Sequence, residues 1–188
     1  MKKVLIIAPV FVVLIVAGVF KFIAVRNALE AQRKAVAAQW MQVDQSLADR
    51  ADLIPKLVTM LQGSAPQETP VIGKIADARA ALAAGRTPQE KIQANDRLSV
   101  ALGRLLLAAE AYPRLRSNRN FLEMQDEIAD SENHIAIERR KYNEVLEHYN
   151  AQIQIFPDNI VASISGFRRN DAYFRTDGAN GGVPKLPF

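Results

Sequence analysis

The chain has no cysteine and only two histidines among its 188 residues. Without cysteine it has no disulfide bond, no thiolate nucleophile and no zinc–thiolate or iron–sulfur centre. Two histidines also argue against a histidine-rich metal site. These two shortages exclude thiol-based chemistry and disfavour histidine-based metal chemistry.

The chain also has little excess of basic over acidic residues outside its N-terminal apolar run. The 24 lysines and arginines exceed the 20 acidic residues by four, but Lys2, Lys3 and Lys21 flank or interrupt an N-terminal apolar run. Without those three, 21 basic residues face 20 acidic ones. A nucleic-acid-binding domain carries a clear basic excess. The sequence therefore predicts a nearly neutral body with no nucleic-acid partner.

What the sequence does have is one long apolar run near its start. Val4 to Phe20 is unbroken, and after Lys21 the run resumes over residues 22–25 before Arg26. A helix of these 22 residues would measure about 33 Å at roughly 1.5 Å per residue, which matches a hydrocarbon core of about 30 Å. The sequence predicts a single-pass transmembrane anchor over residues 1–26.

A cleaved signal peptide is the competing interpretation, because two lysines followed by an apolar run are also a secretory pattern. The run is long for that purpose, and no Ala-x-Ala-like cleavage site follows Lys21, which favours a retained anchor. Basic residues stand on both sides of the run, with Arg26, Arg33 and Lys34 after it. The side of the membrane on which the soluble part lies is therefore open.

Residues 27–165 are predicted to form a helical bundle, because apolar residues recur there at helical spacings. In the first segment a seam with alternating steps of four and three includes one arginine, Arg50, and the only tryptophan, Trp40, which we interpret as a packing anchor. The seam consists of Val36, Trp40, Val43, Leu47, Arg50, Ile54, Leu57 and Leu61.

The last long segment has a seven-residue repeat, which predicts a helix packed nearly parallel or antiparallel to its neighbours. The repeat consists of Phe121, Ile128, Ile135, Tyr142, Tyr149 and Phe156, joined by Leu146 and Ile153.

Polar residues occupy seam positions that should face neighbouring helices. Gln125, Glu132 and Arg139 follow one another at steps of seven in the last long segment. Because a buried charge needs a partner, we expect Arg50 to pair with Glu132 or Glu110 inside the bundle. Polar seam residues fix helix register in coiled coils, so we favour that role over a ligand site.

Two shorter helices are predicted between these segments, over residues 70–84 and 88–112. Thr87 and Glu90 form a Thr-x-x-Glu capping box at the start of the second. The pattern leaves open whether the two stack as one interrupted helix or fold back as a hairpin. Either arrangement gives an all-α, elongated antiparallel bundle of three to four long helices.

After Pro157 the helical pattern weakens. Asp158 and Asn159 are expected to cap a short helix through Ser163, and residues 166–188, rich in Gly, Asn, Asp, Arg and Pro, to form an irregular tail. Its candidate docking points are Phe167, Tyr173, Phe174 and Phe188.

Catalytic and phosphate-binding signatures are missing. The chain has no G-x-S-x-G, G-x-x-x-x-G-K-[ST], G-x-G-x-x-G or H-E-x-x-H motif. His134 and His148 lie on one predicted helix, about 21 Å apart along it, too far to share a metal ion. Neither completes the Glu-x-x-His motif of di-iron bundles. We therefore expect no enzymatic activity, no cofactor and no metal site.

Several short motifs resemble those of the LemA family, in order and with compatible spacing over roughly residues 25–175. The principal ones are Trp40-Met41-Gln42-Val43-Asp44-Gln45-Ser46-Leu47, Arg50-Ala51-Asp52-Leu53-Ile54-Pro55-Lys56-Leu57-Val58, Ala78-Arg79, Glu110-Ala111-Tyr112-Pro113, Asn120-Phe121-Leu122, Tyr142-Asn143, Tyr149-Asn150 and Phe156-Pro157. The resemblance implies a single N-terminal membrane helix, a soluble helical bundle, a bacterial membrane location and no established enzymatic activity. It also implies relatives that take part in building magnetosomes.

One residue of these motifs has a local consequence. Pro55 lies inside the first long helix and lacks the N–H that would bond to the carbonyl of Ala51. A kink or local opening near Ala51 is expected, and we favour a kink without a binding role over a docking notch formed by exposed carbonyls.

The leading hypothesis is a scaffold or adaptor anchored in the bacterial inner membrane, acting through contacts with protein partners or with copies of itself. The alternative is a metal-binding or enzymatic bundle built around Glu110, Glu132, His134 and Arg79, and a third, membrane remodelling by a basic surface, is weakened by the neutral body. The polar network or partner surface is expected to include Arg50, Asp52, Pro55, Arg79, Glu110, Gln125, Glu132 and Arg139.

Overall fold

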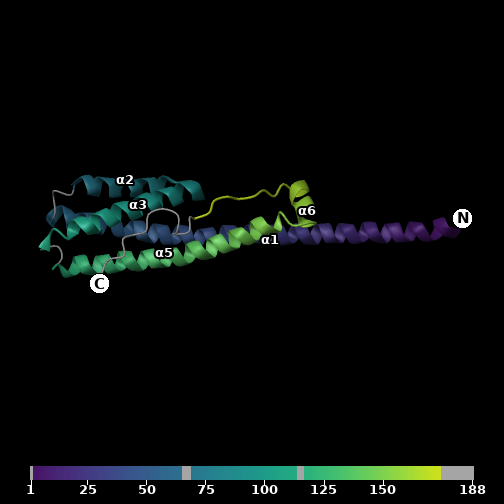
Figure 1. Cartoon of the computed structure of the whole chain (residues 1–188), viewed down its shortest axis with the longest axis horizontal. Coiled ribbons are helices and arrows are strands. Elements are labelled where there is room, and N and C mark those ends of the chain that lie inside the picture. Colours follow the sequence, from purple (N-terminus) through teal and green to yellow (C-terminus); the bar gives the residue numbers. More distant parts are fainter. Residues whose placement is uncertain (1, 65–68, 114–116, 175–188) are drawn as a thin grey trace. The chain divides into compact units, whose positions relative to one another are not determined.

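The computed structural model of the chain describes residues 2–64, 69–113 and 117–174. These residues form α-helices and no strand, which confirms the prediction of an all-α protein with a long apolar N-terminal helix (Figure 1). The helices are α1 (Lys2–Ser64), α2 (Thr69–Ala84), α3 (Pro88–Ala109), α5 (Arg119–Gln152) and α6 (Asp158–Ser165). Phe188 and the rest of the predicted tail after residue 174 lie outside the described residues.

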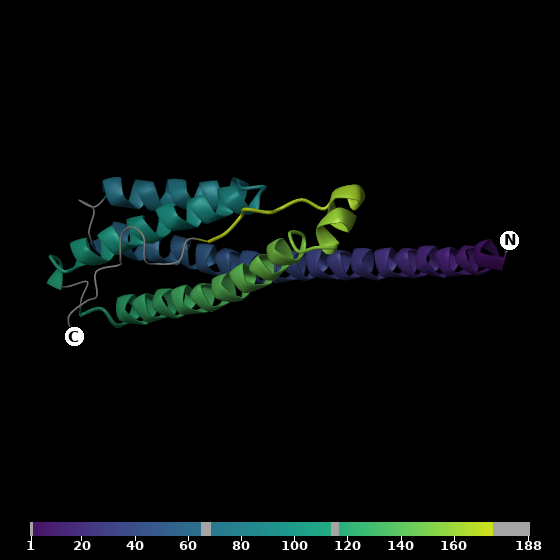
Figure 2. The same ribbon diagram turned by 45° about the vertical axis from the view of Figure 1, so that its right-hand side comes forward.

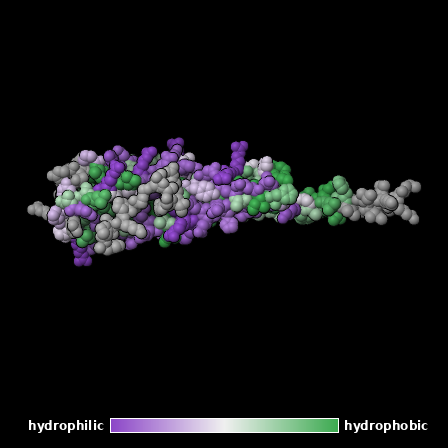
Figure 3. Space-filling model, in the orientation of Figure 1, coloured by the Kyte–Doolittle hydropathy of each residue, from purple (hydrophilic) through white to green (hydrophobic). Residues whose placement is uncertain are grey.

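Helix α1 runs for 63 residues without a break at the predicted boundary between anchor and bundle. By length and composition, it contains a stretch near the N-terminus that can cross a membrane. The side chains of that stretch face outward, as the green surface in Figure 3 shows. The exposed ones are Phe11, Val12, Val13, Leu14, Ile15, Val16, Val19, Phe20 and Ile23.

The chain divides into two compact units. The first comprises residues 1–38 and 144–171, and the second comprises residues 39–143 and 172–188. Helices α1 and α5 each contribute residues to both units. The predicted boundaries after residues 26 and 165 stay predictions.

In the second unit, α2 and α3 form an antiparallel hairpin in which they pack against each other (Figures 1 and 2). This arrangement resolves the choice between an interrupted helix and a hairpin. The turn between them ends in the predicted capping box, in which Thr87 Oγ1 accepts from the Glu90 N–H at 3.2 Å and the Glu90 carboxylate accepts from the Thr87 N–H at 3.2 Å. The box satisfies two backbone donors that α3 itself leaves unpaired.

The seams predicted from the sequence are the buried faces of α1 and α5. Every apolar position of the α1 seam is buried except Trp40, which is half-buried. On α5 the seven-residue repeat is buried up to Tyr149, but Phe156 is 75% exposed. The prediction for Phe156 is wrong because α5 ends at Gln152, so the helical repeat no longer sets the direction of that side chain.

In the first unit, α6 is longer than predicted and begins differently. Its N-cap is Pro157, without a side-chain cap, so the expected capping by Asp158 and Asn159 is wrong. The Asp158 carboxylate instead accepts a hydrogen bond from Gln152 Nε2 at 3.0 Å. This bond ties the first turn of α6 to the end of α5.

The segment after α6 is held by backbone contacts with α5. The Asn150 side chain donates to the Asn170 carbonyl at 2.6 Å and accepts from the Asn170 N–H at 2.9 Å. Tyr149 donates its hydroxyl proton to the Arg168 carbonyl at 2.9 Å, and burial raises the pKa of this phenol. These bonds hold the non-helical segment after α6 against α5.

Candidate functional site

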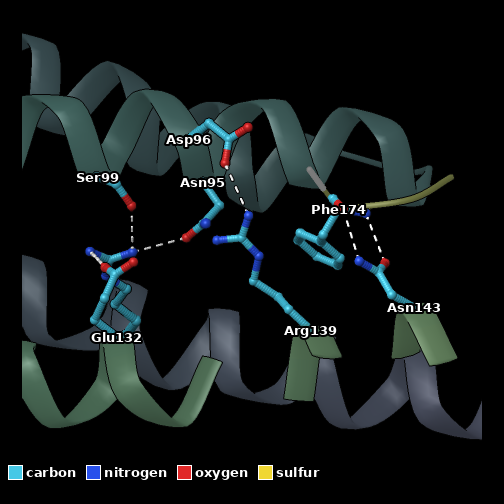
Figure 4. Close-up of polar contacts among 8 residues, drawn as sticks. Asn95, Asp96, Ser99, Glu132, Arg139, Asn143 and Phe174 are labelled. Atoms are coloured by element: carbon cyan, nitrogen blue, oxygen red, sulfur yellow. Dashed lines mark hydrogen bonds and ion pairs between the residues drawn. The ribbon is translucent and has the colours of Figure 1, made fainter. Parts of the chain in front are cut away.

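One of the largest fully buried side chains of the second unit is Arg50, only 2% exposed on the α1 seam. Its guanidinium donates to Asn95 Oδ1 at 3.0 Å and to Ser99 Oγ at 2.9 Å, both on α3. It also forms an ion pair with Glu132 of α5. Figure 4 shows Asn95, Ser99 and Glu132 directed toward the same point between the helices. One side chain therefore connects three helices.

Local sequence explains why these partners meet Arg50. Asn95 and Ser99 are four residues apart on α3, so they lie on the same side of the helix one turn apart. Glu132 lies between the buried residues Ile128 and Ile135 on the inward side of α5. The predicted Arg50–Glu132 pair is confirmed, whereas Glu110, the other predicted partner, is exposed at the C-cap of α3.

Burial lowers the pKa of Arg50, since desolvation disfavours the charged form and nearby Arg139 repels it, while Glu132 opposes both effects. Within the described part of the chain, Arg50 Nε and Asn95 Nδ2 have no hydrogen-bond partner. A guanidinium offers donors only, so it is unsuited to proton transfer. The cluster joins α1, α3 and α5 through two hydrogen bonds and an ion pair.

Arg139 lies on α5 seven residues after Glu132 and makes a second set of polar contacts. Its guanidinium lies 3.9 Å from the Asp96 carboxylate and 4.7 Å from the centre of the Phe174 ring (Figure 4). The ring contact has cation–π geometry. Arg139 thus links α5 with α3 and with the C-terminal segment.

Asn143 holds that segment by its backbone. Its amide donates to the Phe174 carbonyl at 2.8 Å and accepts from the Phe174 N–H at 3.0 Å. The Phe174 ring packs against Trp40 and Tyr142, with centroid separations of 6.1 and 5.9 Å. The predicted docking of Phe174 and the predicted packing role of Trp40 are confirmed in this aromatic cluster.

Glu138 is a buried acid on α5. Its carboxylate accepts from Lys141 Nζ at 2.8 Å and from Gln39 Nε2 of α1 at 2.7 Å. The bond from Lys141 is the largest of the effects that hold its pKa below the ordinary value, and the Gln39 bond adds to it. Glu138 is therefore a charged anchor between α5 and α1.

The notch considered at Pro55 is filled. Arg79 Nε, on α2, donates to the carbonyl of Ala51 at 2.9 Å, which is the carbonyl that Pro55 cannot bond. A side chain of the next helix thus replaces the missing backbone donor. The idea of an open docking notch at this point is wrong, and Arg79 acts as a link between α1 and α2.

The other predicted site residues do not join a single centre. Asp52 is exposed and Gln125 is half-buried. His134 and His148 are exposed on α5. Among residues 2–64, 69–113 and 117–174 no group of three ligand-type side chains could hold a metal ion. Nothing in this part of the chain therefore favours the metal-site alternative.

A groove of about 480 Å³ lies between α2 and α3. Small and apolar side chains line it, namely Ala78, Ala81, Val100 and Ala101. Charged residues border it, the cations being Lys74, Arg97 and Arg104 and the acids Asp77 and Asp96. Val100 is 56% exposed, and Leu107, two turns further along α3, is 49% exposed. The groove thus has an apolar floor and a charged border.

Sequence reasoning missed Asn95, Ser99 and Asn143 as functional positions. Asn95 stands three residues after Ile92 and three before Leu98, both buried, so a polar residue on an apolar helical face was the available signal. Asn143 and Asn150 each follow a buried tyrosine, but no local pattern states that an asparagine will bond to backbone more than 19 residues away.

Comparison with known proteins gives a family and three relatives. The family model that matches is described as the LemA family and covers residues 39–188. Magnetosome proteins MamQ 2 and MamQ 1 of Paramagnetospirillum magneticum are each 37% identical over 75 residues, 40% of this chain and 27% of theirs. Magnetosome protein MamQ of Magnetospirillum gryphiswaldense is 36% identical over 69 residues, 37% of this chain and 25% of its own. The matches span about a quarter of these curated relatives.

Proposed function

The chain belongs to the LemA family, and from this premise we propose that it is a membrane-anchored helical scaffold that acts through protein–protein contacts and catalyses no reaction. The single observation that supports this most is α1 itself. One uninterrupted helix contains both an exposed apolar stretch able to cross a membrane and the buried seam of the bundle. The anchor and the folded part therefore share one continuous helix.

The polar side chains of the bundle support the same proposal. The guanidinium of Arg50 and that of Arg79 are engaged with other helices, and Glu138 is engaged with Gln39 and Lys141. Side chains committed in this way hold structure and are not available to a substrate. We place the chain in the bacterial inner membrane with a single pass.

The groove between α2 and α3 is the contact surface that we assign to a protein partner. Its alanine-lined floor permits close approach of a helix, as small residues do at helix interfaces. The exposed Val100 and Leu107 lie two turns apart on α3 and add apolar contact area. Charged residues at the border restrict which partner can approach.

Site-specific photocrosslinking in intact cells tests this role. A photoreactive amino acid at Val100 should give discrete higher-mass adducts, because this side chain lines the groove. The matched control is Ile137, 44% exposed on α5 and outside the groove, which should give few. No adducts from Val100 above the control, together with purification as a monomer without partners, would contradict a scaffold role.

Elemental analysis of the purified full chain tests the absence of metal chemistry. We expect no stoichiometric transition metal. One metal ion per chain would contradict the proposal and favour a metal-binding bundle.

A further inference from the structure

Four large apolar side chains are exposed around α6 in the first unit. Ile155 and Phe156, in the turn before the helix, are 60% and 75% exposed, and Ile160 and Ile164, on the helix, are 51% and 71% exposed. Single exposed apolar residues are common on protein surfaces, whereas a contiguous group marks a contact surface. We refer to these four residues as the α6 patch.

The fold of α6 forces the patch outward. Val161 and Ala162, 7% and 2% exposed, occupy the face of α6 that packs inward. Ile160 and Ile164 are one turn apart on the opposite side. The helix ends at Gly166, whose φ of 76° suits glycine, and the Phe167 N–H bonds to the Ala162 carbonyl at 2.9 Å. The orientation of α6 is thus determined at both its inner face and its C-terminus.

The same compact unit contains the apolar stretch of α1. Figures 1 and 2 both show α6 beside α1. The Arg33 guanidinium lies 5.7 Å from the centre of the Phe167 ring, directly after α6. Val25, the last residue of the apolar run, is only 5% exposed, and Leu29 is fully buried, so α1 is covered by protein where the run ends.

The end of the apolar run is where the edge of a membrane is expected. Arg33 follows Val25 by eight residues, about 12 Å along a helix, and the headgroup layer occupies roughly 5–8 Å on each side of the hydrocarbon core. The Arg33–Phe167 contact therefore lies a few ångströms beyond the headgroup layer, whereas the protein already covers α1 at Val25 and Leu29, where the apolar run ends. Exposed basic side chains of the same unit include Arg26, Arg33, Lys34 and Arg168. Basic residues beside apolar ones are typical of surfaces that bind anionic lipid.

We propose that the α6 patch inserts into the interface of the same bilayer that α1 crosses, which makes α6 a second, lipid-binding contact of the chain with its membrane. This inference rests on the proposed membrane anchor. Lipid is assigned as the occupant because the patch belongs to the compact unit that contains the membrane stretch, and because exposed basic side chains of that unit suit anionic headgroups. Two contacts restrict how α1 can tilt and rotate in the bilayer, which one helix alone does not.

The absence of cysteine allows a direct test with single-cysteine variants of the full chain. Ile164→Cys and Phe156→Cys carry an environment-sensitive fluorophore, and the protein is reconstituted into phosphatidylcholine–phosphatidylglycerol vesicles containing nitroxide-labelled lipid. We expect severalfold quenching at both positions. The matched control is Ile137→Cys on α5, 44% exposed in the other unit, which should show little quenching. Phe156 lies in a turn and is 75% exposed, so its substitution leaves the helices intact.

Val16→Cys separates this inference from the anchor. Quenching at Val16→Cys without quenching at Ile164→Cys and Phe156→Cys would overturn the inference and leave the anchor in place. Absence of quenching at all three positions would overturn both. A fluorophore at Ile164→Cys that is shielded from an aqueous quencher but not quenched by nitroxide lipid would indicate a second copy of the chain on the patch, and would also overturn the inference.

Discussion

Replacing Arg50 is expected to lower the free energy of unfolding. In Arg50→Met the apolar side chain fits the seam, but the buried Asn95 oxygen loses its donor. An unsatisfied buried polar group costs about 1–3 kcal/mol. We expect a loss of this size in the free energy of unfolding, measured by urea titration of the full chain in detergent.

The partner of Arg50 should show a larger effect. Glu132→Leu leaves the guanidinium buried without its counter-charge, which costs about 3–5 kcal/mol. The double variant Arg50→Met/Glu132→Leu should be more stable than Glu132→Leu alone. As a control, Arg119→Met disrupts the exposed Arg119–Glu123 pair and should cost less than about 1 kcal/mol. Equal stability of Arg50→Met and the natural chain would remove the register role from Arg50.

Glu138 gives the protein a predictable response to acid. Its folded pKa lies below the ordinary value, so its stabilising effect is fully present above the unfolded pKa of about 4.3 and is lost as the pH falls through the folded pKa. In Glu138→Gln the unfolding free energy should therefore fall less steeply below about pH 4.3. Glu123→Gln, at an exposed pair on the same helix, is the control, and an unchanged acid slope in Glu138→Gln would contradict the prediction.

At the scale of the helices, α1 depends on α2 to complete its own backbone bonding. Arg79 supplies the donor that Pro55 lacks, so the two residues should be energetically coupled. Arg79→Met in the natural chain removes the only donor shown for the Ala51 carbonyl among the described residues. We expect it to cost about 1–2 kcal/mol in unfolding free energy.

The coupling appears when both residues are changed. In Pro55→Ala the new N–H can bond to the Ala51 carbonyl within α1, so Arg79→Met in that background should cost about 1 kcal/mol less than in the natural chain. Arg86→Met, an exposed arginine in the turn between α2 and α3, is the matched control. Additive effects of Pro55→Ala and Arg79→Met would mean that Arg79 does not replace the missing donor.

At the scale of the whole molecule, the proposed location depends on the apolar stretch of α1. Arginine near the centre of a membrane helix costs about 2.5–3.5 kcal/mol per residue on the insertion scale. The variant Val13→Arg/Val16→Arg should therefore leave the membrane fraction and appear in the supernatant of an alkaline carbonate wash. Val100→Arg, which changes an exposed valine of α3, should remain in the pellet. Release of both variants or of neither would contradict a single anchor in α1.

Much of the fold could be predicted because it depends on the spacing of apolar residues that are close together in the sequence. The α1 seam from Val36 to Leu61, the burial of Ile128 and Ile135, and the capping box at Thr87 all follow from spacings of three, four and seven residues. The prediction failed where the periodicity ended. Phe156 continues the seven-residue repeat, but α5 ends at Gln152, and Asp158 is a good capping residue, but Pro157 is the N-cap of α6.

The candidate site could be predicted only in part. A charge on an apolar seam must be paired, so the sequence identifies Arg50 as a residue that needs a partner. Glu132 is a candidate because it is an acidic residue at a seam position of the last long segment. That Asn95 and Ser99 share the same guanidinium could not be predicted, because it depends on how α3 rotates against α1. The same is true of Arg79 at the Ala51 carbonyl.

The sequence by itself determined that the chain is helical, that its N-terminal run can cross a membrane, and which faces of α1 and α5 are buried. These properties depend on the order of neighbouring residues and on the transfer of apolar surface from water. Only the tertiary structure decided that α2 and α3 form a hairpin, which partners Arg50 and Arg79 take, and that Phe174 closes the aromatic cluster. Those contacts join residues far apart in the chain, and hydrogen bonds and ion pairs act only over a few ångströms, so the packing must exist before the partners can be known.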